Sequence, residues 1–338
     1  MRPWPSAITL AIALSTMIVA AQGQSLTAGN CSTDDEVSSA ERAPYEGAAT
    51  RFVETILGDK PQESYGQLTA ELRGKVSEEN VVRTIQGVRA NRPLTKIRVE
   101  HSYRESQVTL GSGVNFFVCT AVANGSVATP AGRVMIAAMP VPLQAYVIVE
   151  GKAQNNRWAF VIWLLPNRQE WKIEAFYILP ATILDRSAND IWNLARQEHQ
   201  QGHDLNSFLL YVTAEQLAGR GPNLQLGLQP EIQKELSALS RPSELQGSPP
   251  FEWKFAGGAY HVANIGPIGV GNVFDLSIVH QVAQTSDTKE LERQNRLLIK
   301  WFKDAHPDYS TVFDGLVVQA LMPDGTGFRT VEQSRGGP

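Results

Sequence analysis

The chain has 338 residues, of which 43% are hydrophobic and 19% charged, and its formal net charge is −4 at neutral pH. This length predicts two or three domains with cores of their own. A mildly acidic chain without clustered Lys and Arg lacks the electrostatic footprint of a nucleic-acid-binding protein. Its 2 cysteines are too few for a disulfide framework or a cysteine-based metal site.

The N-terminus carries the pattern of an export signal. Arg2 supplies a positive charge, and residues 7–21 form an almost uninterrupted apolar run. This run is shorter than the roughly 20 residues of a membrane-spanning helix, and small residues at Ala21 and Gly23 suit cleavage by a signal peptidase. We therefore expect residues 1–23 to be a signal peptide, the mature protein to be secreted or periplasmic, and no membrane span to remain after cleavage.

A flexible leader is expected after the signal, because residues 24–41 are polar and acidic. The leader contains Cys31, but the preceding Asn30 does not fit the small residue that stands before a lipid-modified cysteine. The other cysteine, Cys119, falls in an apolar strand. We favour a small buried side chain at Cys119 over a disulfide between the two cysteines, and both interpretations stay open.

Helices are predicted first in the next segment. The clearest one has an apolar stripe at helical spacing and stops at Gly58. The stripe consists of Tyr45, Ala48, Ala49, Phe52, Val53, Ile56 and Leu57. Two further helices are expected after Pro61 and from Ser77. The pattern then changes to period two, which predicts strands near residues 97–103, 114–122, 143–150, 158–165 and 171–178.

This order of helices before a curved antiparallel sheet, closing with residues 171–180, resembles the NTF2-like (cone-shaped α+β) superfamily over residues 43–181. The best local feature is the segment at 48–59, AATRFVETILGD, followed by Tyr65 and Leu68. The resemblance implies a cone whose helices cover a bent sheet. The superfamily includes enzymes, binding modules and structural spacers, so the fold alone does not select a function.

The remainder of the chain predicts further helices and strands. Residues 185–239 are expected to form a helical hairpin that opens on a capping box at Ser187 and Asp190, with a rhythm that resembles a tetratricopeptide hairpin. Residues 240–250 have the composition of a linker, and residues 251–331 predict a small C-terminal α+β domain. The predicted fold class is therefore α+β throughout.

Three motif-like segments are explained better by local structure than by chemistry. His199 and His203 have the spacing of metal ligands, but Gly202 interrupts the helix between them, which favours ordinary loop histidines. Residues 286–289 match the S-x-x-K pattern of penicillin-recognising enzymes without its other motifs, so a helix N-cap is the better interpretation. The glycines of residues 266–271 indicate a turn. We expect no catalytic set, no metal and no cofactor.

Two strands suggest a ligand pocket, because alternate residues share a face. The side chains expected on the inner face of the cone are Ile97, Val99, His101 and Tyr103 on one strand and Trp171, Ile173, Ala175 and Tyr177 on the other. Polar groups of His101 and Tyr103 beside an aromatic wall of Trp171 and Tyr177 would suit a small ligand. In the competing interpretation, His101 and Tyr103 lie near a strand end and reach water.

Three functions are compatible with these patterns. We favour an exported, non-catalytic binding module that offers a surface to a protein partner or a small apolar ligand. The second is a small enzyme of the ketosteroid-isomerase or dehydratase type, with His101 as general base and Tyr103 as hydrogen-bond donor. The third is an architectural spacer for the C-terminal domain, which requires the cone to be filled by large side chains such as Phe117 and Trp163.

Overall fold

The computed structural model describes residues 30–58, 60–91, 94–106, 115–120, 122–123, 126–127, 133–138, 141–153, 155–255, 258–285 and 287–333. The predicted signal peptide lies outside these residues. The chain divides into two compact units. We call the described residues up to Ala181, together with Ala218–Glu231, the N-terminal unit, and the described residues of Thr182–Leu217 and from Ile232 onward the C-terminal unit. Both contain helices and strands, which confirms the α+β class.

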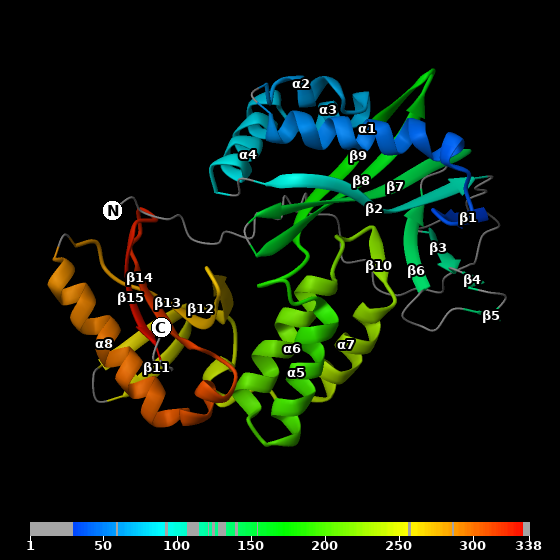
Figure 1. Cartoon of the computed structure of the whole chain (residues 1–338). Coiled ribbons are helices and arrows are strands. Elements are labelled where there is room, and N and C mark those ends of the chain that lie inside the picture. Colours follow the sequence, from blue (N-terminus) through cyan, green and yellow to red (C-terminus); the bar gives the residue numbers. More distant parts are fainter. Residues whose placement is uncertain are drawn as a thin grey trace. The chain divides into compact units, whose positions relative to one another are not determined.

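The N-terminal unit consists of an antiparallel sheet with helices along one face (Figure 1). In spatial order the strands are β1 (Asn30–Thr33), β2 (Thr95–Ser106), β7 (Leu143–Ala153), β8 (Asn156–Asn167) and β9 (Glu170–Pro180). The helices are α1 (Ser39–Leu57), α2 (Glu63–Gly66), α3 (Ala70–Lys75) and α4 (Glu78–Asn91). A smaller sheet joins β10 (Leu224–Leu226), β6 (Arg133–Ala138) and β3 (Asn115–Thr120), and β4 (Val122–Ala123) pairs with β5 (Ser126–Val127).

Helix α1 confirms the predicted apolar stripe, but it begins earlier than expected. The side chain of Ser38 accepts the N–H of Glu41 as N-cap, and Gly58 ends the helix. The prediction of a flexible leader is wrong from residue 30 onward, because β1 pairs with β2 and α1 already starts at Ser39. Backbone hydrogen bonds to β2, rather than local composition, order this segment.

The helix-covered face of the sheet is densely apolar. Its buried members come from α1, α4 and strands β7, β8 and β9, including Phe52, Ile56, Ile85, Val147, Val149, Phe160, Ile162 and Ile173. Burial of each such side chain contributes about 1.5–3 kcal/mol before the entropy of ordering is subtracted. This layer therefore fixes the helices on the sheet.

Besides a register shift between Thr95 and Arg98, one β-bulge within each of the two predicted pocket strands changes which face the following residues present. In the β2–β7 pair, Val99 lies opposite Val149 and His101 lies opposite Ile148, so Glu100 is the extra residue. In the β8–β9 pair, Glu174 is skipped in the same way. A bulge shifts the side-chain alternation by one residue, so the two predicted four-residue faces are wrong: each is divided between the two sides of the sheet.

The contacts of β2 with α1 confirm this shift. Ile97 and Val99 pack against the helix layer before the bulge. After the bulge it is Ser102 that reaches α1, where its hydroxyl donates to Glu46 Oε1 at 2.7 Å. Tyr103 consequently turns to the other side of the sheet.

We call this other side the distal face. Its cluster contains Tyr103, Tyr146, Ile148, Ala159, Val161, Trp163, Ala175, Tyr177 and Leu179, together with Cys119, Leu224 and Leu226 from the smaller sheet. The five-stranded sheet is thus buried on both faces, since helices cover one and strands β3 and β10 pack on the other.

A disulfide joins Cys31 in β1 to Cys119 in β3, with a Cα–Cα distance of 5.1 Å. The favoured prediction of an unbridged Cys119 is therefore wrong, although the side chain is fully buried as expected. Sequence patterning could not select the bridge, because it depends on a strand pairing of β1 that the polar leader does not reveal. The bridge ties the first described strand to the smaller sheet.

The C-terminal unit contains a five-stranded sheet with helix α8 (Thr288–Ala305) packed on it. The strands, in spatial order, are β11 (Phe251–Phe255), β12 (Gly258–Val270), β13 (Val273–Gln281), β14 (Gly315–Leu321) and β15 (Gly327–Gln333). The pair β13–β14 is parallel and α8 connects its strands, whereas the other neighbours are antiparallel. The predicted α8 N-cap is confirmed, since Asp287 accepts the N–H groups of Lys289 and Glu290.

Three further helices belong to this part of the chain: α5 (Ala188–Gln200), α6 (Asp204–Ala218) and α7 (Leu228–Ala238). The capping box of Ser187 and Asp190 is present. Glu235 of α7 accepts hydrogen bonds from Trp192 of α5 and Tyr211 of α6, both at 2.9 Å. The expected hairpin is therefore closed by a third helix.

The segment predicted as a linker, residues 240–250, is packed within the C-terminal unit. It contains a short 3-10 turn, Ser243–Leu245, in which Leu245 is buried. The indole N–H of Trp253 donates to the carbonyl of Glu244 at 2.8 Å. The Pro and Ser residues of this segment therefore form turns within the unit and not a spacer between domains.

Candidate functional site

The structure does not gather the four predicted pocket residues into one pocket: His101 and Tyr103 remain neighbours, with ring centroids 6.4 Å apart, but Trp171 lies on the other side of the sheet from Tyr103 and Tyr177. His101 is half exposed, with 52% of its side-chain surface accessible, and its Nδ1 lies 3.3 Å from Oδ2 of Asp34. It therefore reaches water, as the competing interpretation predicted, but that interpretation is wrong for Tyr103. Tyr103 is buried on the distal face, and burial raises the pKa of its phenol.

Trp171 and Tyr177 lie on opposite sides of the sheet because the bulge at Glu174 stands between them. Trp171 packs edge-on against Tyr45 of α1, with ring centroids 5.4 Å apart. Tyr177 joins the distal face, where its hydroxyl accepts a hydrogen bond from Asn223 at 3.1 Å. Trp171 and Tyr177 therefore do not form one aromatic wall.

Aromatic rings occupy the space between helices and sheet, where the pocket was expected. Phe52 of α1 meets Phe176 of β9 with a centroid distance of 5.1 Å, and Tyr45 is also buried there. Trp163, expected to fill the cone, lies on the distal face instead. The side chain of Phe117 lies outside the described residues.

The distal face also contains a buried carboxyl, that of Glu105, which was not among the predicted site residues. Glu105 lies opposite Gln144 in the β2–β7 pair, is 0% exposed, and neither of its carboxyl oxygens has a hydrogen-bond partner among the described residues. Burial raises the pKa of Glu105 to about 8. The sequence signal was available: Glu105 follows Tyr103 by two residues, so the strand period places an acid beside a buried phenol.

Aromatic and amide groups surround Glu105. The indole N–H of Trp163 donates to Gln144 Oε1 at 3.0 Å, and the rings of Trp163 and Tyr146 stack at 5.1 Å. Burial is the main cause that raises the pKa of Tyr146 well above its ordinary value, and the nearby carboxyl of Glu105 adds to it. The described residues thus place one buried acid beside two stacked aromatic rings.

The other edge of the distal face is ionic. Glu150 is buried and accepts a hydrogen bond from Arg157 at 3.1 Å. Arg220 interacts electrostatically with Glu150 and Tyr103, and burial lowers the pKa of its guanidinium. A polar edge at each end of an apolar strip can orient an amphipathic molecule.

The two histidines with metal-ligand spacing do not form a pair: His199 of α5 is exposed, and His203, in the turn between α5 and α6, has structural contacts. His203 Nδ1 lies 2.9 Å from Glu198 Oε2, and that buried carboxylate also accepts hydrogen bonds from Asn206 and Thr311. Within the described ranges, no group of three or more His, Cys, Asp or Glu side chains is arranged to hold a metal ion.

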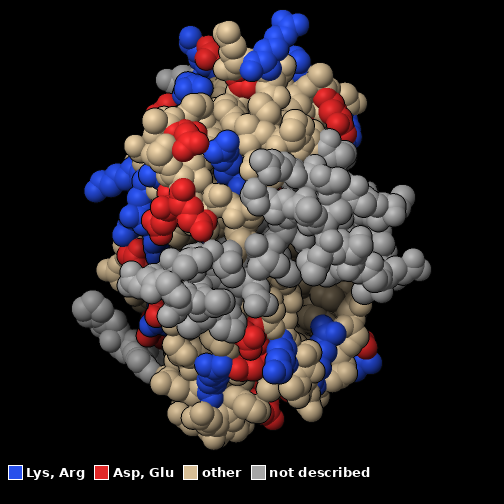
Figure 2. Space-filling model, turned by 90° about the vertical axis from the view of Figure 1, so that its right-hand side faces the viewer, with Lys and Arg blue, Asp and Glu red and all other residues tan. Residues whose placement is uncertain are grey.

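The surface charges are mixed. On the face shown in Figure 2, the described Lys and Arg side chains are interspersed with Asp and Glu instead of forming one field. In the part of the chain that the structure describes, none of the helices has both the length and the apolar character that crossing a bilayer requires.

Neither a protein-family model, nor a curated protein, nor a solved structure matches this chain.

Proposed function

We propose that the protein is a non-catalytic binding module whose N-terminal, NTF2-like unit holds a small amphipathic ligand at the distal face. The observation that carries this proposal is the buried carboxyl of Glu105, whose two oxygens have no hydrogen-bond partner among the described residues. Folded proteins satisfy the great majority of their buried polar atoms, and an unsatisfied one often marks a ligand or catalytic role.

The surroundings of Glu105 define the chemistry of the ligand. A carboxyl with a pKa near 8 is largely protonated at neutral pH, so it can both donate and accept a hydrogen bond. The stacked rings of Tyr146 and Trp163 favour an apolar or aromatic body. The ligand class is therefore an uncharged, mostly apolar molecule with one hydroxyl, carbonyl or amide group.

Native mass spectrometry of the mature chain, purified without denaturant, tests this proposal. We expect an adduct of small-molecule mass on the wild-type protein and its loss on Glu105→Gln and Glu105→Leu. The matched control is Glu174→Gln, because Glu174 is also buried in this sheet but accepts a hydrogen bond from Thr69 at 2.7 Å. The control variant should keep the adduct.

The same variants separate ligand binding from a purely structural role. If Glu105→Leu raises the free energy of unfolding and the wild-type protein carries no adduct, then Glu105 is only a buried acid and the proposal is wrong. Replacing a buried, unpaired charge-bearing group by an apolar one commonly stabilises a protein.

A second candidate, acid–base catalysis in the same unit, is favoured by the pKa of Glu105. A carboxyl that titrates near pH 8 can exchange a proton with a bound substrate, whereas the exposed His101 lacks a shielded environment. Turnover of the ligand extracted from the wild-type protein would distinguish this candidate. Its rate should follow the titration of Glu105 and disappear in Glu105→Gln.

Export from the cytoplasm is the last element of the proposal. The apolar run at residues 7–21 supports it, and so does the Cys31–Cys119 disulfide, since such bonds persist mainly in oxidising compartments. Mass spectrometry of the N-terminus from a bacterial periplasmic fraction should find a chain that begins after Ala21 or Gly23. Recovery of the uncleaved chain in the cytoplasm alone would contradict export.

A further inference from the structure

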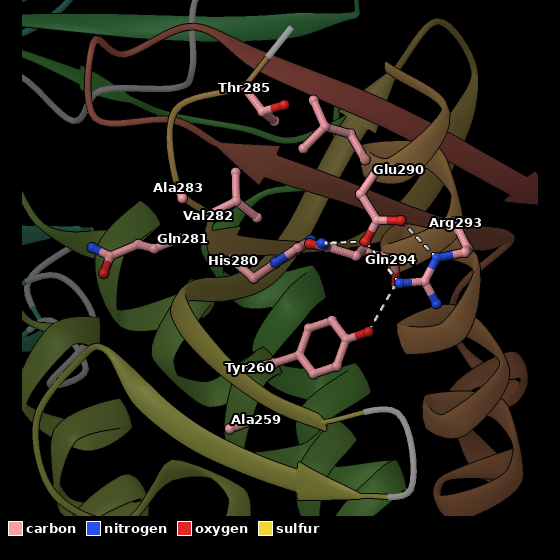
Figure 3. Close-up of a pocket in the computed structure, with 11 residues that line it drawn as sticks. Ala259, Tyr260, His280, Gln281, Val282, Ala283, Thr285, Glu290, Arg293 and Gln294 are labelled. Carbon is pink, nitrogen blue, oxygen red and sulfur yellow. Dashed lines mark hydrogen bonds and ion pairs between the residues drawn. The ribbon is translucent and has the colours of Figure 1, made fainter. Parts of the chain in front are cut away.

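A separate hollow lies in the C-terminal unit, at the carboxyl end of β13, where the chain turns into α8 (Figure 3). Its volume is about 340 Å³, and its polar lining includes Tyr260, His280, Glu290, Arg293 and Gln294. Pockets for small ligands begin at roughly 300 Å³. The hollow is therefore large enough for a molecule built on a single ring.

A buried histidine forms part of this pocket. His280 is 1% exposed, and its Nε2 lies 2.7 Å from Oδ1 of Asn295. The amide nitrogen of Asn295 donates to the carbonyls of Val318 and Phe328, at 3.2 and 3.1 Å, which fixes the orientation of the amide. Because Oδ1 can only accept, Nε2 of His280 carries the hydrogen.

The other ring nitrogen of His280 is consequently an acceptor. Burial lowers the pKa of His280, which keeps the ring neutral at physiological pH. The single hydrogen bond of this side chain within the described residues is the one through Nε2. Nδ1 thus offers a lone pair in a residue that lines the hollow.

The ring of Tyr260 forms a rigid wall beside His280. The two rings meet edge to face at 5.3 Å, and the Tyr260 hydroxyl donates to the carbonyl of Gln294 at 3.3 Å. Behind Tyr260, Phe255 stacks at 4.7 Å and stacks in turn on Trp301 at 4.7 Å. This ladder holds the Tyr260 ring in one orientation before any ligand arrives, which limits the entropic cost of binding.

The charged groups at the pocket neutralise each other. Arg293 donates through Nε and Nη2 to the two oxygens of Glu290, both at 2.7 Å, and Gln294 donates to the same carboxylate at 2.8 Å (Figure 3). A ligand with a net charge would have to disrupt this bidentate ion pair between Arg293 and Glu290. The pocket therefore favours an uncharged molecule.

We propose that this pocket binds a small, planar, neutral molecule that donates an N–H or O–H to Nδ1 of His280 and lies against the ring of Tyr260. The matching chemical class is a single-ring heterocycle with an amide or lactam group. Nicotinamide and uracil are suitable probes, and benzoate and benzamidine are charged molecules of similar size.

Two-bond ¹H–¹⁵N NMR of the histidine-labelled mature protein tests the proposal on the wild type, and a substitution of His280 serves only to assign its signal. His280, assigned by its loss in His280→Phe, should show a neutral ring with hydrogen on Nε2. Nicotinamide or uracil should shift the Nδ1 signal saturably, and benzoate and benzamidine should bind at least tenfold more weakly. The exposed His261 on β12 is the internal control and should not respond.

Two variants of the loop before α8 give a matched comparison. Ala283 lines the hollow and is exposed, so Ala283→Trp should obstruct the entrance without disturbing the core and lower the affinity about tenfold. Gln284 is also exposed but does not line the hollow, so Gln284→Trp should bind like the wild type.

Three results would each overturn this inference. They are a hydrogen on Nδ1 of His280, an Nδ1 signal that no neutral probe shifts up to its solubility limit, and an Ala283→Trp variant that binds the probes as the wild type does. None of these results bears on Glu105, which belongs to the other unit.

Discussion

Tyr103 lies directly opposite Tyr146 in the β2–β7 pair, and both rings belong to the distal face of the sheet. The alternation of residues 97–103 would have placed Tyr103 with Ile97 against the helices. The single extra residue at Glu100 reverses that orientation. The same shift carries Glu105 into the aromatic layer, where its carboxyl has no partner among the described residues.

Glu105 predicts a definite pH dependence of stability. Its pKa is about 8 in the folded protein and near the ordinary 4.5 in the unfolded chain, so the folded state binds the proton more tightly. Its contribution is therefore fully present below about pH 4.5 and is lost as the pH rises through 8, with a slope of up to about 1.4 kcal/mol per pH unit.

Urea unfolding of wild type and Glu105→Gln between pH 5 and 8 measures this effect. The difference in the free energy of unfolding, wild type minus variant, should decline steadily as the pH rises. Glu170→Gln is the control: the hydrogen bond from Lys172 lowers the pKa of Glu170, so its titration falls below this pH window. An unchanging difference for Glu105→Gln would contradict the predicted shift.

The disulfide is expected to be a major contributor to the stability of the N-terminal unit. It connects residues 88 positions apart, and closing so long a loop restricts the unfolded chain by about 2–5 kcal/mol. Reductant should lower the melting temperature of the wild type. The double variant Cys31→Ser, Cys119→Ser should melt at the lower temperature with or without reductant, and equal melting of all forms would refute this role.

Gly221 is expected to tolerate no side chain. Its φ is +86°, and a Cβ there would lie 2.7 Å from Cδ2 of Tyr177. Gly221→Ala should combine about 1 kcal/mol of backbone cost with about 1–3 kcal/mol from the clash. Gly202→Ala is the matched control, because Gly202 has φ +79° with open space around it and should lose only the backbone part. Equal losses in chemical denaturation would show that Tyr177 moves aside freely.

Asn295 should be essential to the C-terminal unit. Its side chain is 0% exposed and bonds to His280 and to the backbone of β14 and β15. Asn295→Ala leaves those groups buried and unpaired, which should cost about 2–4 kcal/mol. Arg296→Ala, at the exposed neighbouring position, should cost about 0.5 kcal/mol or less. Thermal unfolding of both variants measures this difference in stability, and equal losses would contradict the predicted role of Asn295.

The sequence predicted those elements whose signals are local. The stripe from Tyr45 to Ile56, the capping box at Ser187 and the N-cap of α8 depend on neighbours within a few residues, and all are present. The fold class followed from the succession of these patterns. The resemblance to NTF2-like domains and the predicted export stay predictions.

The features that were missed are non-local. A bulge at Glu100 or Glu174 is defined by the pairing of two strands, and no residue type marks it in a single strand. The order of residues 30–33 and the disulfide depend on β2 and β3, which are far away in the chain. The predicted pocket was wrong for this reason, because both predicted faces assumed uninterrupted alternation across a position where the strand has a bulge.

The 12 residues of strand β2 therefore pack against two different sets of neighbours. Substitutions at Ile97 or Val99 should be compensated by changes in the helix layer, and those at Tyr103 by changes in the smaller sheet that carries Cys119. In an alignment of related chains, we expect the two halves of this strand to covary with different partners. Glu100 would then separate two groups of covarying positions within a single strand. A deletion of Glu100 would turn the side chains that follow it to the opposite side of the sheet.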